Sequence, residues 1–401
     1  MNNFIAKIEG HGNLNIDWDA GEVKLNIFEG ERLFEGILVG RTAEEMAWIT
    51  PRICGVCPTA HNLASLNAIE NALGIKPSKT TVLLRDLMQC GQMIQSHVLH
   101  LFFLVLPDYI GIDRATELAP KNPAAFKDAL SLKEVSDKIV QIVGGRIVHP
   151  TTTTIGGFHK VPTKSALKVL LKKLKETEDA ARKTIQIFEG IEYPELKVDL
   201  KLAAQEGEYI IAVSSTDIEK KDKSLITDYK KNIEEEVREY STAKFSKYKG
   251  EETLVGSLAR LAVNEKIKRG EKIDFTNPFH NNIAQAIETL YCHQKAIEIV
   301  EKLLEMKINA EAIKQSSNPS LKGIGSTEAP RGGLYHEVHL NKNNDIIYAN
   351  IITPTVQNLT SIEKSAKALL GQTKNKSREE MEKLLTMLVR AYDPCISCSA
   401  H

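Results

Sequence analysis

The chain ends with Asp393-Pro394-Cys395-Ile396-Ser397-Cys398-Ser399-Ala400-His401, a stretch that places two thiols, a carboxylate and an imidazole close together. Cys395 and Cys398 form a C-x-x-C pair, and the other such pair is Cys54-Gly55-Val56-Cys57. Four soft thiol ligands in two pairs predict a transition-metal site. Because the pairs lie near opposite ends of the chain, nearly the whole chain must fold before the metal is bound. This arrangement favours a buried catalytic centre over a local structural zinc site, which remains the alternative.

The residues around the two pairs resemble those of the large subunit of nickel-iron hydrogenases. Residues 52–61 match the pattern R-x-C-G-x-C-x-x-x-H, and residues 393–401 match D-P-C-x-x-C-x-x-H, at every fixed position. The resemblance covers the whole chain, including Glu9-Gly10-His11 near the start and Glu328-Ala329-Pro330-Arg331-Gly332 later on. It implies the nickel-iron hydrogenase large-subunit fold. This fold is α+β and mainly α, with a central bundle of long helices and small peripheral antiparallel sheets.

This resemblance implies a nickel-iron centre held by the four cysteines. Cys54 and Cys395 would be terminal nickel ligands, while Cys57 and Cys398 would bridge nickel to an iron that carries cyanide and carbon monoxide. His61 would hydrogen-bond the bridging thiolate of the first pair. From its pattern alone, a single histidine on a helix is more often a packing residue.

Three more residues are assigned to the centre by the same resemblance. Glu9 would relay protons that a terminal thiolate, most plausibly Cys395, takes up; a solvated acid at the end of a strand is the alternative. Arg331 lies beside Pro330 in an expected loop over residues 323–333. It would project over the metals and donate to the cyanide ligands, and an exposed arginine is the alternative.

A second, hard metal ion is implied near the C-terminus. Glu35 lies inside an apolar run, where a buried carboxylate needs a cation or a donor, unless it is exposed on an edge strand. In the family, the matching glutamate helps to hold magnesium together with the terminal histidine and a backbone carbonyl. Here these would be His401 and the carbonyl of Ile352. His401 would also be the mature terminus, because family members lose a short extension after this histidine.

Overall composition excludes some partners. The 401 residues include 52 basic and 52 acidic side chains, so the formal net charge is zero and we expect no nucleic acid partner. The N-terminal residues show no signal or transit pattern. The longest apolar run, residues 98–106, is interrupted by His100 and is too short to span a bilayer. We therefore expect a cytoplasmic protein without a membrane span.

The cysteine count also predicts a partner subunit. Cys90 and Cys292 are the two cysteines outside the pairs, which is too few for an iron-sulfur cluster, and we expect them to be buried packing residues. No G-x-G-x-x-G stretch follows a strand to seat a nicotinamide or flavin. Electrons must therefore leave through another polypeptide. We expect this partner to be an iron-sulfur small subunit. The resemblance further implies flavin-containing diaphorase subunits and transient contacts with a nickel chaperone and a maturation protease.

Shorter stretches bear on the electron acceptor. Residues 276–279 and 390–399 resemble the cytosolic bidirectional group, particularly its NAD(P)-linked sulfhydrogenase-like alpha subunits. This implies reversible oxidation of dihydrogen with transfer of electrons to NAD(P). Val56 stands where some sulfhydrogenases have a bulkier residue, so a complex linked to deazaflavin or ferredoxin is one alternative. A gas-sensing regulatory relative and a non-enzymatic zinc protein are the others.

Hydrophobic patterns predict the elements that carry these residues. Polar and apolar residues alternate over residues 4–9 and 22–27, which predicts two strands joined by a turn at residues 19–21. A hairpin of residues 334–340 and 346–352 is expected later. The ranges with helical periodicity are 58–73, 78–106, 131–143, 164–188, 278–306 and 377–390. His97 and His100, on one face of the second helix, have no acidic residue nearby in the sequence and are expected to pack.

We expect one catalytic domain over residues 1–401, because the cysteine pairs bring the chain ends together. Composition changes at about residues 195–255, which predicts an inserted peripheral α/β lobe. Short strands are expected there at residues 196–202 and 209–213. A Lys/Glu-rich helix is expected over residues 222–240, with its charges forming a solvated face.

Overall fold

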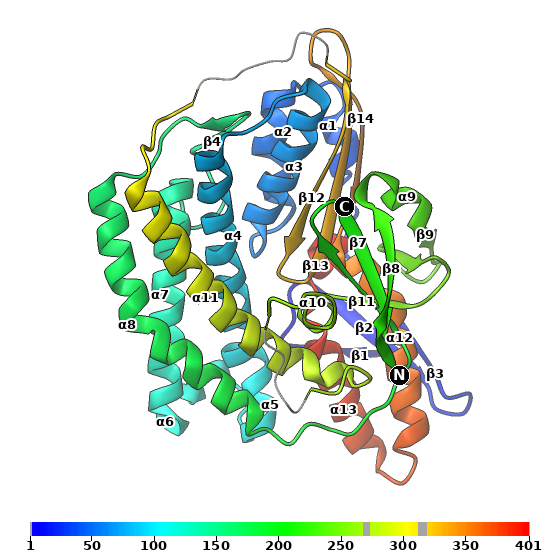
Figure 1. Ribbon diagram of the computed structural model, residues 1–401. Helices are drawn as coiled ribbons and strands as arrows, with labels where there is room; N and C mark the ends of the chain where they lie inside the picture. The colour runs from blue at the N-terminus through cyan, green and yellow to red at the C-terminus, as the bar shows by residue number, and fades with distance from the viewer. Residues whose placement is uncertain (1, 268–272, 312–318, 401) are drawn as a thin grey trace.

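The structure is a computed structural model that describes residues 2–267, 273–311 and 319–400. Long helices form a bundle on one side of the molecule, and small sheets lie on the other side (Figure 1). The four main helices of the bundle are α4 (Lys79–Leu99), α7 (Pro123–Gly144), α8 (Lys164–Glu189) and α11 (Asn281–Glu305). This arrangement confirms the predicted α+β, mainly α fold.

Apolar stripes explain the bundle. The buried side of α8 carries Leu167, Leu170 and Leu174, while its other face is rich in lysine and glutamate. Gly91 on α4 allows the close approach of α7, because a Cβ atom there would lie 2.9 Å from the Cγ2 atom of Ile139. Helices α4 and α7 are therefore in close contact around Gly91.

The second predicted helix does not end at Pro107. After α4, the chain continues through a π-helical turn, η2 (His100–Val105), into α5 (Leu106–Ile110). Pro107 lies in the first turn of α5, where an N–H is not needed, and Gly111 ends the helix at φ +68°. Lys79–Ile110 is long and apolar enough to cross a membrane by length and composition, but 67% of its most apolar window is buried inside the protein. Such burial is typical of a core helix.

The N-terminal sheet differs from its prediction. It has three antiparallel strands, β1 (Asn2–Phe4), β2 (Gly12–Asp17) and β3 (Glu22–Ile27). The turn at residues 19–21 is confirmed, because β2 and β3 pair up to Asp17 and Glu22. The predicted strand over residues 4–9 is wrong, since positive φ angles at Lys7 and Gly10 break the extended run.

The inserted segment contains more strands than predicted. A four-stranded sheet consists of β6 (Lys201–Glu206), β7 (Tyr209–Ser214), β8 (Asp217–Leu225) and β11 (Thr253–Val255). A hairpin of β9 (Ile233–Val237) and β10 (Lys244–Tyr248) lies beside it. The predicted helix over residues 222–240 is wrong, because only the short helix α9 (Tyr229–Asn232) forms there. The lobe's status as an inserted unit stays a prediction.

A third sheet packs against the helix that follows the first cysteine pair. Its strands are β12 (Lys322–Ala329), β13 (Gly332–Leu340) and β14 (Ile346–Ile352), and the helix is α3 (Pro58–Leu73). The predicted hairpin is confirmed, but β12 occupies most of the expected loop at residues 323–333. Gly325 allows the contact, because a Cβ atom there would lie 2.2 Å from the carbonyl oxygen of Ala64.

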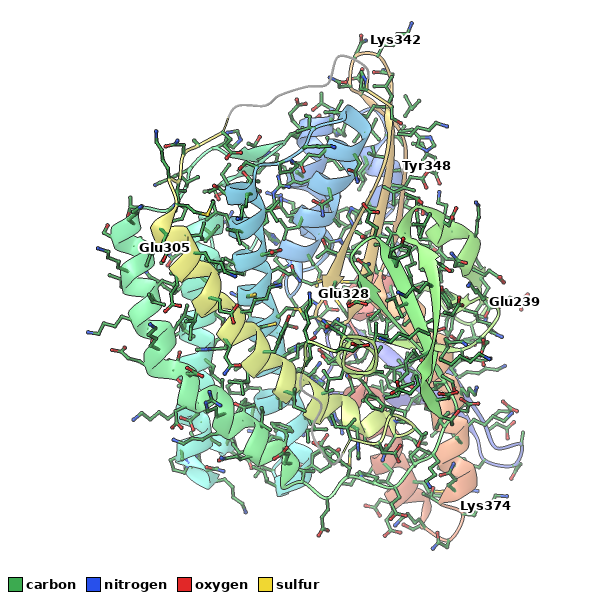
Figure 2. All side chains as sticks on the ribbon, viewed as in Figure 1. Glu239, Glu305, Glu328, Lys342, Tyr348 and Lys374 are labelled. Atoms are coloured by element: carbon green, nitrogen blue, oxygen red, sulfur yellow. The ribbon has the colours of Figure 1, made fainter. Side chains whose placement is uncertain are left out.

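Two further helices deliver the C-terminal cysteine pair. Helix α12 (Pro354–Gln372) was not predicted, whereas α13 (Arg378–Ala391) matches its prediction. The short helix α14 (Ile396–Ser399) follows. The remaining elements are α1 (Phe34–Leu38), α2 (Ala43–Ile49), η1 (Thr50–Ile53), η3 (Ala115–Glu117), α6 (Leu118–Lys121), β4 (Thr153–Thr154), β5 (Gly157–Phe158), η4 (Ile226–Asp228), α10 (Ser257–Val263) and η5 (Pro278–His280). Charged side chains cover much of the outside, whereas Glu328 lies between the bundle and the sheets (Figure 2).

Candidate metal centre

The two cysteine pairs meet in the interior, as the sequence predicts. The Sγ atoms of Cys54 and Cys395 are 3.2 Å apart, those of Cys57 and Cys398 are 3.5 Å apart, and those of Cys395 and Cys398 are 2.6 Å apart. All four sulfurs lie within 4.8 Å of one another, and all four residues are buried. Across residues 2–267, 273–311 and 319–400, no other group of three or more His, Cys, Asp or Glu side chains has this geometry.

Backbone geometry fixes each pair. Cys57 is the N-cap residue of α3, and its N–H donates to the Sγ atom of Cys54 at 3.4 Å. The N–H of Val56 donates to the same sulfur at 3.2 Å. In the second pair, the N–H of Cys395 donates to the hydroxyl of Thr355 at 3.0 Å. The amide groups of Val56 and Cys57 and the N-terminus of α3 favour thiolate at Cys54.

The donor set fits a soft metal centre. Hydrogen bonds, first from Cys395, hold the pKa of the Cys54 thiol well below its usual value. Burial raises the pKa values of the Cys395 and Cys398 thiols well above their usual value. Four adjacent buried sulfurs can all be thiolates only if cations lie among them, since a coordinating thiol loses its proton. Thiolates also select soft transition metals over magnesium or calcium.

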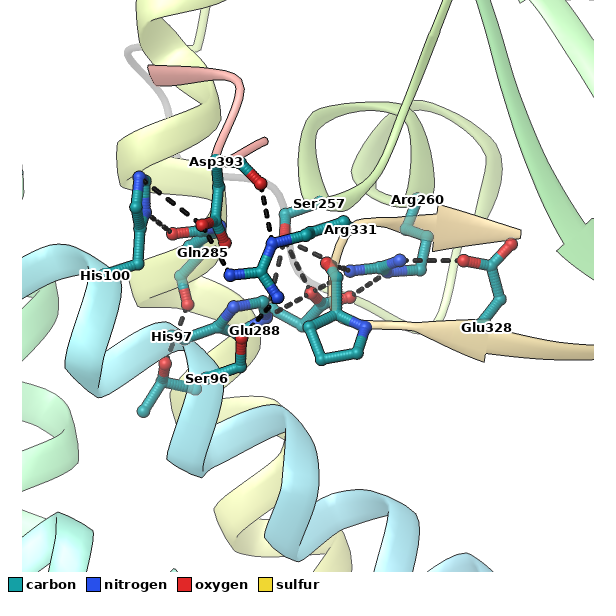
Figure 3. Close-up of polar contacts among 12 residues, drawn as sticks. Ser96, His97, His100, Ser257, Arg260, Gln285, Glu288, Glu328, Arg331 and Asp393 are labelled. Atoms are coloured by element: carbon teal, nitrogen blue, oxygen red, sulfur yellow. Dashed lines mark hydrogen bonds and ion pairs between the residues drawn. The ribbon is translucent and has the colours of Figure 1, made fainter. Parts of the chain in front are cut away.

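Arg331 is buried beside the sulfurs rather than exposed. Its Nε atom donates to the backbone carbonyl of Asp393 at 2.6 Å, and its Nη2 atom donates to the Oδ1 atom of Asp393 at 2.8 Å (Figure 3). Its Nη1 atom donates to the hydroxyl of Ser96 at 3.3 Å. Burial opposes the charge, but Asp393 and the cysteine sulfurs raise the pKa of Arg331 overall. A fixed positive charge therefore faces the four thiols, and Pro330 precedes it in the same tight turn.

Glu9 reaches the centre although it is not in a strand. Its backbone forms an isolated bridge with Cys395, and its carbonyl accepts a hydrogen bond from the N–H of Ile396 at 3.0 Å. Its carboxylate accepts from the N–H of Ser397 at 3.1 Å. The structure thus places a half-buried carboxylate beside the second cysteine pair, and its role in proton transfer stays a prediction.

His61 belongs to a buried chain of polar side chains that the sequence did not reveal. Its Nδ1 atom lies 3.3 Å from the Nε2 atom of His336, whose Nδ1 atom lies 3.0 Å from the hydroxyl of Ser65. The hydroxyl of Ser65 lies 2.6 Å from that of Thr50. His336 is on β13, 275 residues from His61, so no local pattern could connect them. These hydrogen-bonded side chains hold His61 one turn after Cys57. The hydrogen bond from His61 to the thiolate of Cys57 stays a prediction.

The structure describes two of the three predicted ligands of the hard metal ion, Glu35 and Ile352. Glu35 lies in α1 rather than on a strand, and its Oε1 atom accepts from the N–H of Ile351 at 2.7 Å and from the side chain of Asn350 at 3.1 Å. Ile352 is the next residue on β14, so the carboxylate and that end of the strand are neighbours. His401 lies outside the described residues. Magnesium binding stays a prediction.

The two histidines on the long helix pack, but both have an acidic neighbour: Glu288 lies beside His97, and the Nε2 atom of His100 lies 3.8 Å from the Oδ1 atom of Asp393. The Nε2 atom of His97 lies 2.8 Å from the Oε2 atom of Glu288, whose position on α11 no local pattern could reveal. His100 lies 2.5 Å from the Oε1 atom of Gln285 and 2.6 Å from the carbonyl of Arg390. The expected burial of the two remaining cysteines is confirmed, with Cys90 and Cys292 exposed by 3% and 6%.

The enclosed thiol cluster, closed by both ends of a mainly helical chain, defines a protein with a buried soft-metal site. The sequence profile of the family described as "Nickel-dependent hydrogenase" matches residues 32–129 and 208–401. The chain belongs to this family, as its sequence motifs predict. It is the catalytic large subunit of a nickel-iron hydrogenase, an oxidoreductase, and its four-cysteine cluster fits the nickel-iron centre.

Curated relatives extend over nearly the whole chain. The alpha subunit of sulfhydrogenase 1 from Pyrococcus furiosus is 36% identical over 420 aligned residues, which cover 99% of this chain and 96% of the relative. One subunit of the F420-non-reducing hydrogenase from Methanothermobacter marburgensis is 30% identical, with coverage of 99% and 93%. Both are named as single subunits of hydrogenases, so this chain is similar to proteins that work with other subunits.

Solved structures confirm the fold. The NAD+-reducing [NiFe]-hydrogenase in its H2-reduced state aligns with a TM-score of 0.87 and 24% identity, covering 100% of this chain and 98% of that one. A [NiFeSe] hydrogenase variant from Desulfovibrio vulgaris Hildenborough aligns with a TM-score of 0.80 and 22% identity, with coverage of 100% and 98%. The predicted large-subunit architecture is therefore correct.

Proposed function

We propose that this protein activates dihydrogen within a cytosolic complex that passes the electrons reversibly to NAD(P). The observation that carries the proposal is the buried cluster of four cysteine sulfurs beneath Arg331 and beside Glu9. When bound, the nickel-iron centre supplies the Lewis-acidic site at which dihydrogen is split into two protons and two electrons. The iron would carry cyanide and carbon monoxide.

The chain's own residues hold the centre and move the proton. Cys57 and Cys398 would hold the two metals through their sulfurs, and Cys54 and Cys395 would complete the nickel ligands. The Sγ atom of Cys395 would take up the first proton, and the backbone of Glu9 pairs with this residue. The carboxylate of Glu9 accepts that proton next.

Arg331 has a separate role in the proposal. Its guanidinium is held by Asp393 on one side and can donate on the other side to the cyanide ligands of the iron. Near the C-terminus, Glu35, the carbonyl of Ile352 and His401 would hold magnesium. Glu35 supports this part of the proposal, since its hydrogen bonds to the described residues use one carboxylate oxygen and leave the other able to bind a cation.

Electrons leave through a partner that carries iron-sulfur clusters. A surface near Cys54 suits it, because Trp48, Ile147 and Val148 are exposed by 39%, 38% and 39%. Arg52, which is hydrogen-bonded to the carbonyl of Trp48, lies beside His149, whose pKa is lowered by burial and by the charge of Arg52. The charge of Cys54 opposes this shift of the His149 pKa, so this surface lies near one of the sulfur ligands. An apolar and basic surface of this kind favours a stable interface.

The similar proteins support two different electron acceptors, NAD(P) and deazaflavin. The structural match to a hydrogenase named as NAD+-reducing favours NAD(P), as does the resemblance of residues 276–279 and 390–399 to the NAD(P)-linked group. One observation favours a deazaflavin acceptor instead: the alpha subunit of the coenzyme F420 hydrogenase from Methanocaldococcus jannaschii is 28% identical over 98% of this chain. The flavin-containing diaphorase subunits belong only to the first proposal.

Parallel acceptor assays test the proposal. The native complex is purified without oxygen, and hydrogen-dependent reduction of NADP, NAD and deazaflavin is measured in parallel, with an artificial dye as the control for activity. We expect NADP or NAD to be reduced together with the dye. Reduction of deazaflavin alone would contradict the NAD(P) assignment. Replacement of Trp48 by glutamate should release the cluster-bearing partner and abolish dye reduction, while the isolated subunit keeps its nickel and iron in elemental analysis.

A further inference from the structure

Arg331 stands on a turn that needs external support. Residues Ala329 and Gly332 pair at the ends of β12 and β13, so only Pro330 and Arg331 form the turn between the strands. Gly332 has φ +133°, a conformation that favours glycine. A long side chain on a two-residue turn stays aimed only if the backbone of the turn is fixed. The described contacts show which residue fixes it.

Arg260 on α10 binds the carbonyl groups on both sides of this turn. Its Nη1 atom donates to the carbonyl of Ala329 at 2.9 Å, and its Nη2 atom donates to the carbonyl of Pro330 at 2.8 Å. The Nη2 atom also lies 3.2 Å from the hydroxyl of Ser257. Thus one buried guanidinium spans the two carbonyls that precede Arg331 in the chain.

Two carboxylates fix the guanidinium itself (Figure 3). Glu288 accepts from the Nε atom at 2.5 Å and from the Nη2 atom at 2.6 Å, and Glu328 accepts from the Nη1 atom at 2.7 Å. Although burial opposes ionisation, Arg260 and His97 keep the pKa of Glu288 below its usual value. Burial lowers the pKa of His97, so at neutral pH this histidine is a neutral donor to Glu288. The ion pair between Arg260 and Glu288 therefore persists at neutral pH.

The backbone before α10 presses on the same turn. A Cβ atom at Gly256 would lie 3.1 Å from the carbonyl oxygen of Arg331, and Gly256 has φ +117°. A Cβ atom at Gly332 would lie 2.4 Å from the Cγ2 atom of Val255. The segment that carries Arg260 thus contacts the turn through its backbone as well as through a side chain.

We propose that Arg260 is a positioning residue that holds the Ala329 and Pro330 carbonyls so that Arg331 stays aimed at the metal centre. The proposal rests on the proposed function for its catalytic consequence. A lysine could not replace Arg260, because its single ammonium group cannot bind two carbonyls and two carboxylates in one fork. The hydrogen bonds of Arg260 reach none of the four clustered cysteines, so it acts on the centre through the turn.

An adjacent cavity allows the proposal to be tested by chemical rescue of a variant that lacks the Arg260 side chain. A cavity of about 160 Å³ is lined by Arg260, Glu288 and Glu328 together with Cys90 and Cys292. Removal of the Arg260 side chain would join its volume to this space. The two carboxylates and two carbonyls left behind would then bind free guanidinium ion.

Arg85 provides a matched control. It is 6% exposed, compared with 5% for Arg260, and it also forms a buried ion pair, donating to Glu70 at 2.7 and 2.6 Å. Its backbone contact is the carbonyl of Thr154, away from the Arg331 turn. Arg85→Ala therefore removes the same chemistry without removing a contact to Ala329 or Pro330.

The experiment compares Arg260→Ala, Arg260→Lys and Arg85→Ala. Hydrogen exchange of residues 329–334 is measured by mass spectrometry, and the cyanide infrared bands and turnover per nickel are measured in the assembled protein. We expect both Arg260 variants to exchange faster in this segment, to shift the cyanide bands and to lose about 100-fold in turnover, as small misplacements of a positioned group can cause. Guanidinium ion should restore Arg260→Ala, whereas ammonium ion should not. Arg85→Ala should change none of these readouts.

Two results would overturn the proposal. One is unchanged exchange and unchanged bands in Arg260→Lys, the variant with less risk of misfolding. The other is an equal effect of Arg85→Ala, which would show a general loss of stability. If the wild-type protein itself has no cyanide bands, the proposed function fails, but exchange of residues 329–334 in the metal-free protein still decides whether Arg260 holds the turn.

Discussion

Replacement of Glu9 by glutamine tests the proton route at a single atom. The carboxylate of Glu9 accepts one hydrogen bond, from the N–H of Ser397 at 3.1 Å, and the backbone of Glu9 holds Ile396 at 3.0 Å. A glutamine side chain is nearly isosteric, so its oxygen can still accept from Ser397. The backbone bridge to Cys395 does not involve the side chain. The substitution should therefore remove proton transfer and little else.

The expected loss of stability in Glu9→Gln is much smaller than the expected loss of rate. A hydrogen bond to a charged group contributes about 1.5 to 3 kcal/mol and a neutral one about 0.5 to 1.5 kcal/mol, so Glu9→Gln should cost about 1 kcal/mol of stability. That loss leaves a domain with several kcal/mol of stability folded. Loss of a positioned proton acceptor costs about 10²- to 10⁴-fold in rate, or about 3 to 5 kcal/mol in barrier height. The rate effect should dominate.

Hydrogen-deuterium exchange between dihydrogen and heavy water measures this step directly. Glu9→Gln should retain its metals and melt close to the wild-type temperature, while its exchange rate falls at least about 100-fold. Glu29→Gln is the matched control, because Glu29 is a nearby carboxylate whose hydrogen bonds are with His11 rather than with the cysteine pair. Wild-type exchange in Glu9→Gln with normal metal content would refute a relay through Glu9.

Three further predictions concern assembly, packing and pH. Cys398→Ser should abolish metal incorporation and hydrogenase activity, because a hydroxyl cannot replace a bridging thiolate, whereas Cys292→Ser should keep both metals in elemental analysis. Gly325→Ala should lower the free energy of unfolding by about 3 kcal/mol in denaturant titrations, since its Cβ atom would lie 2.2 Å from backbone atoms of α3. Gly371→Ala, which meets open space in α12, should instead gain about 0.5 to 1 kcal/mol. Burial lowers the pKa of His293 to about 4 from 6.5, so the unfolded chain binds its proton more tightly. About 3 kcal/mol of stability should be present above pH 6.5 and lost as the pH falls towards 4, and His293→Gln should remove this pH dependence.

The parts of the site that sequence could predict are those written in local patterns. Both cysteine pairs, the helix that begins at Pro58 and helix α13 all have short-range signals. The family resemblance assigned Glu9 to the centre, and the structure places it beside Cys395 even though the strand predicted for it does not form. The resemblance therefore located this residue better than the alternation of polar and apolar residues predicted the element that carries it.

The parts that sequence could not predict depend on contacts between distant residues. The alternation of charges over residues 222–240 fits either a solvated helix or exposed strands, and pairing of β8 with β7 and of β9 with β10 decides for strands. Residues 323–329 contain two glycines, which suggested a loop. In the structure those glycines let a strand pack on α3. Arg260, Glu288 and His336 carry no local signal, because their partners come from other elements.

Elemental analysis combined with infrared spectroscopy on one anaerobically purified sample tests the central claim most directly. The four sulfurs, all within 4.8 Å of one another, should hold one nickel and one iron per chain, and the sample should show cyanide and carbon monoxide bands while it reduces a dye with hydrogen. The predicted result is nickel and iron in equal amounts with both kinds of band. A sample that contains zinc, no nickel and no such bands would contradict the account.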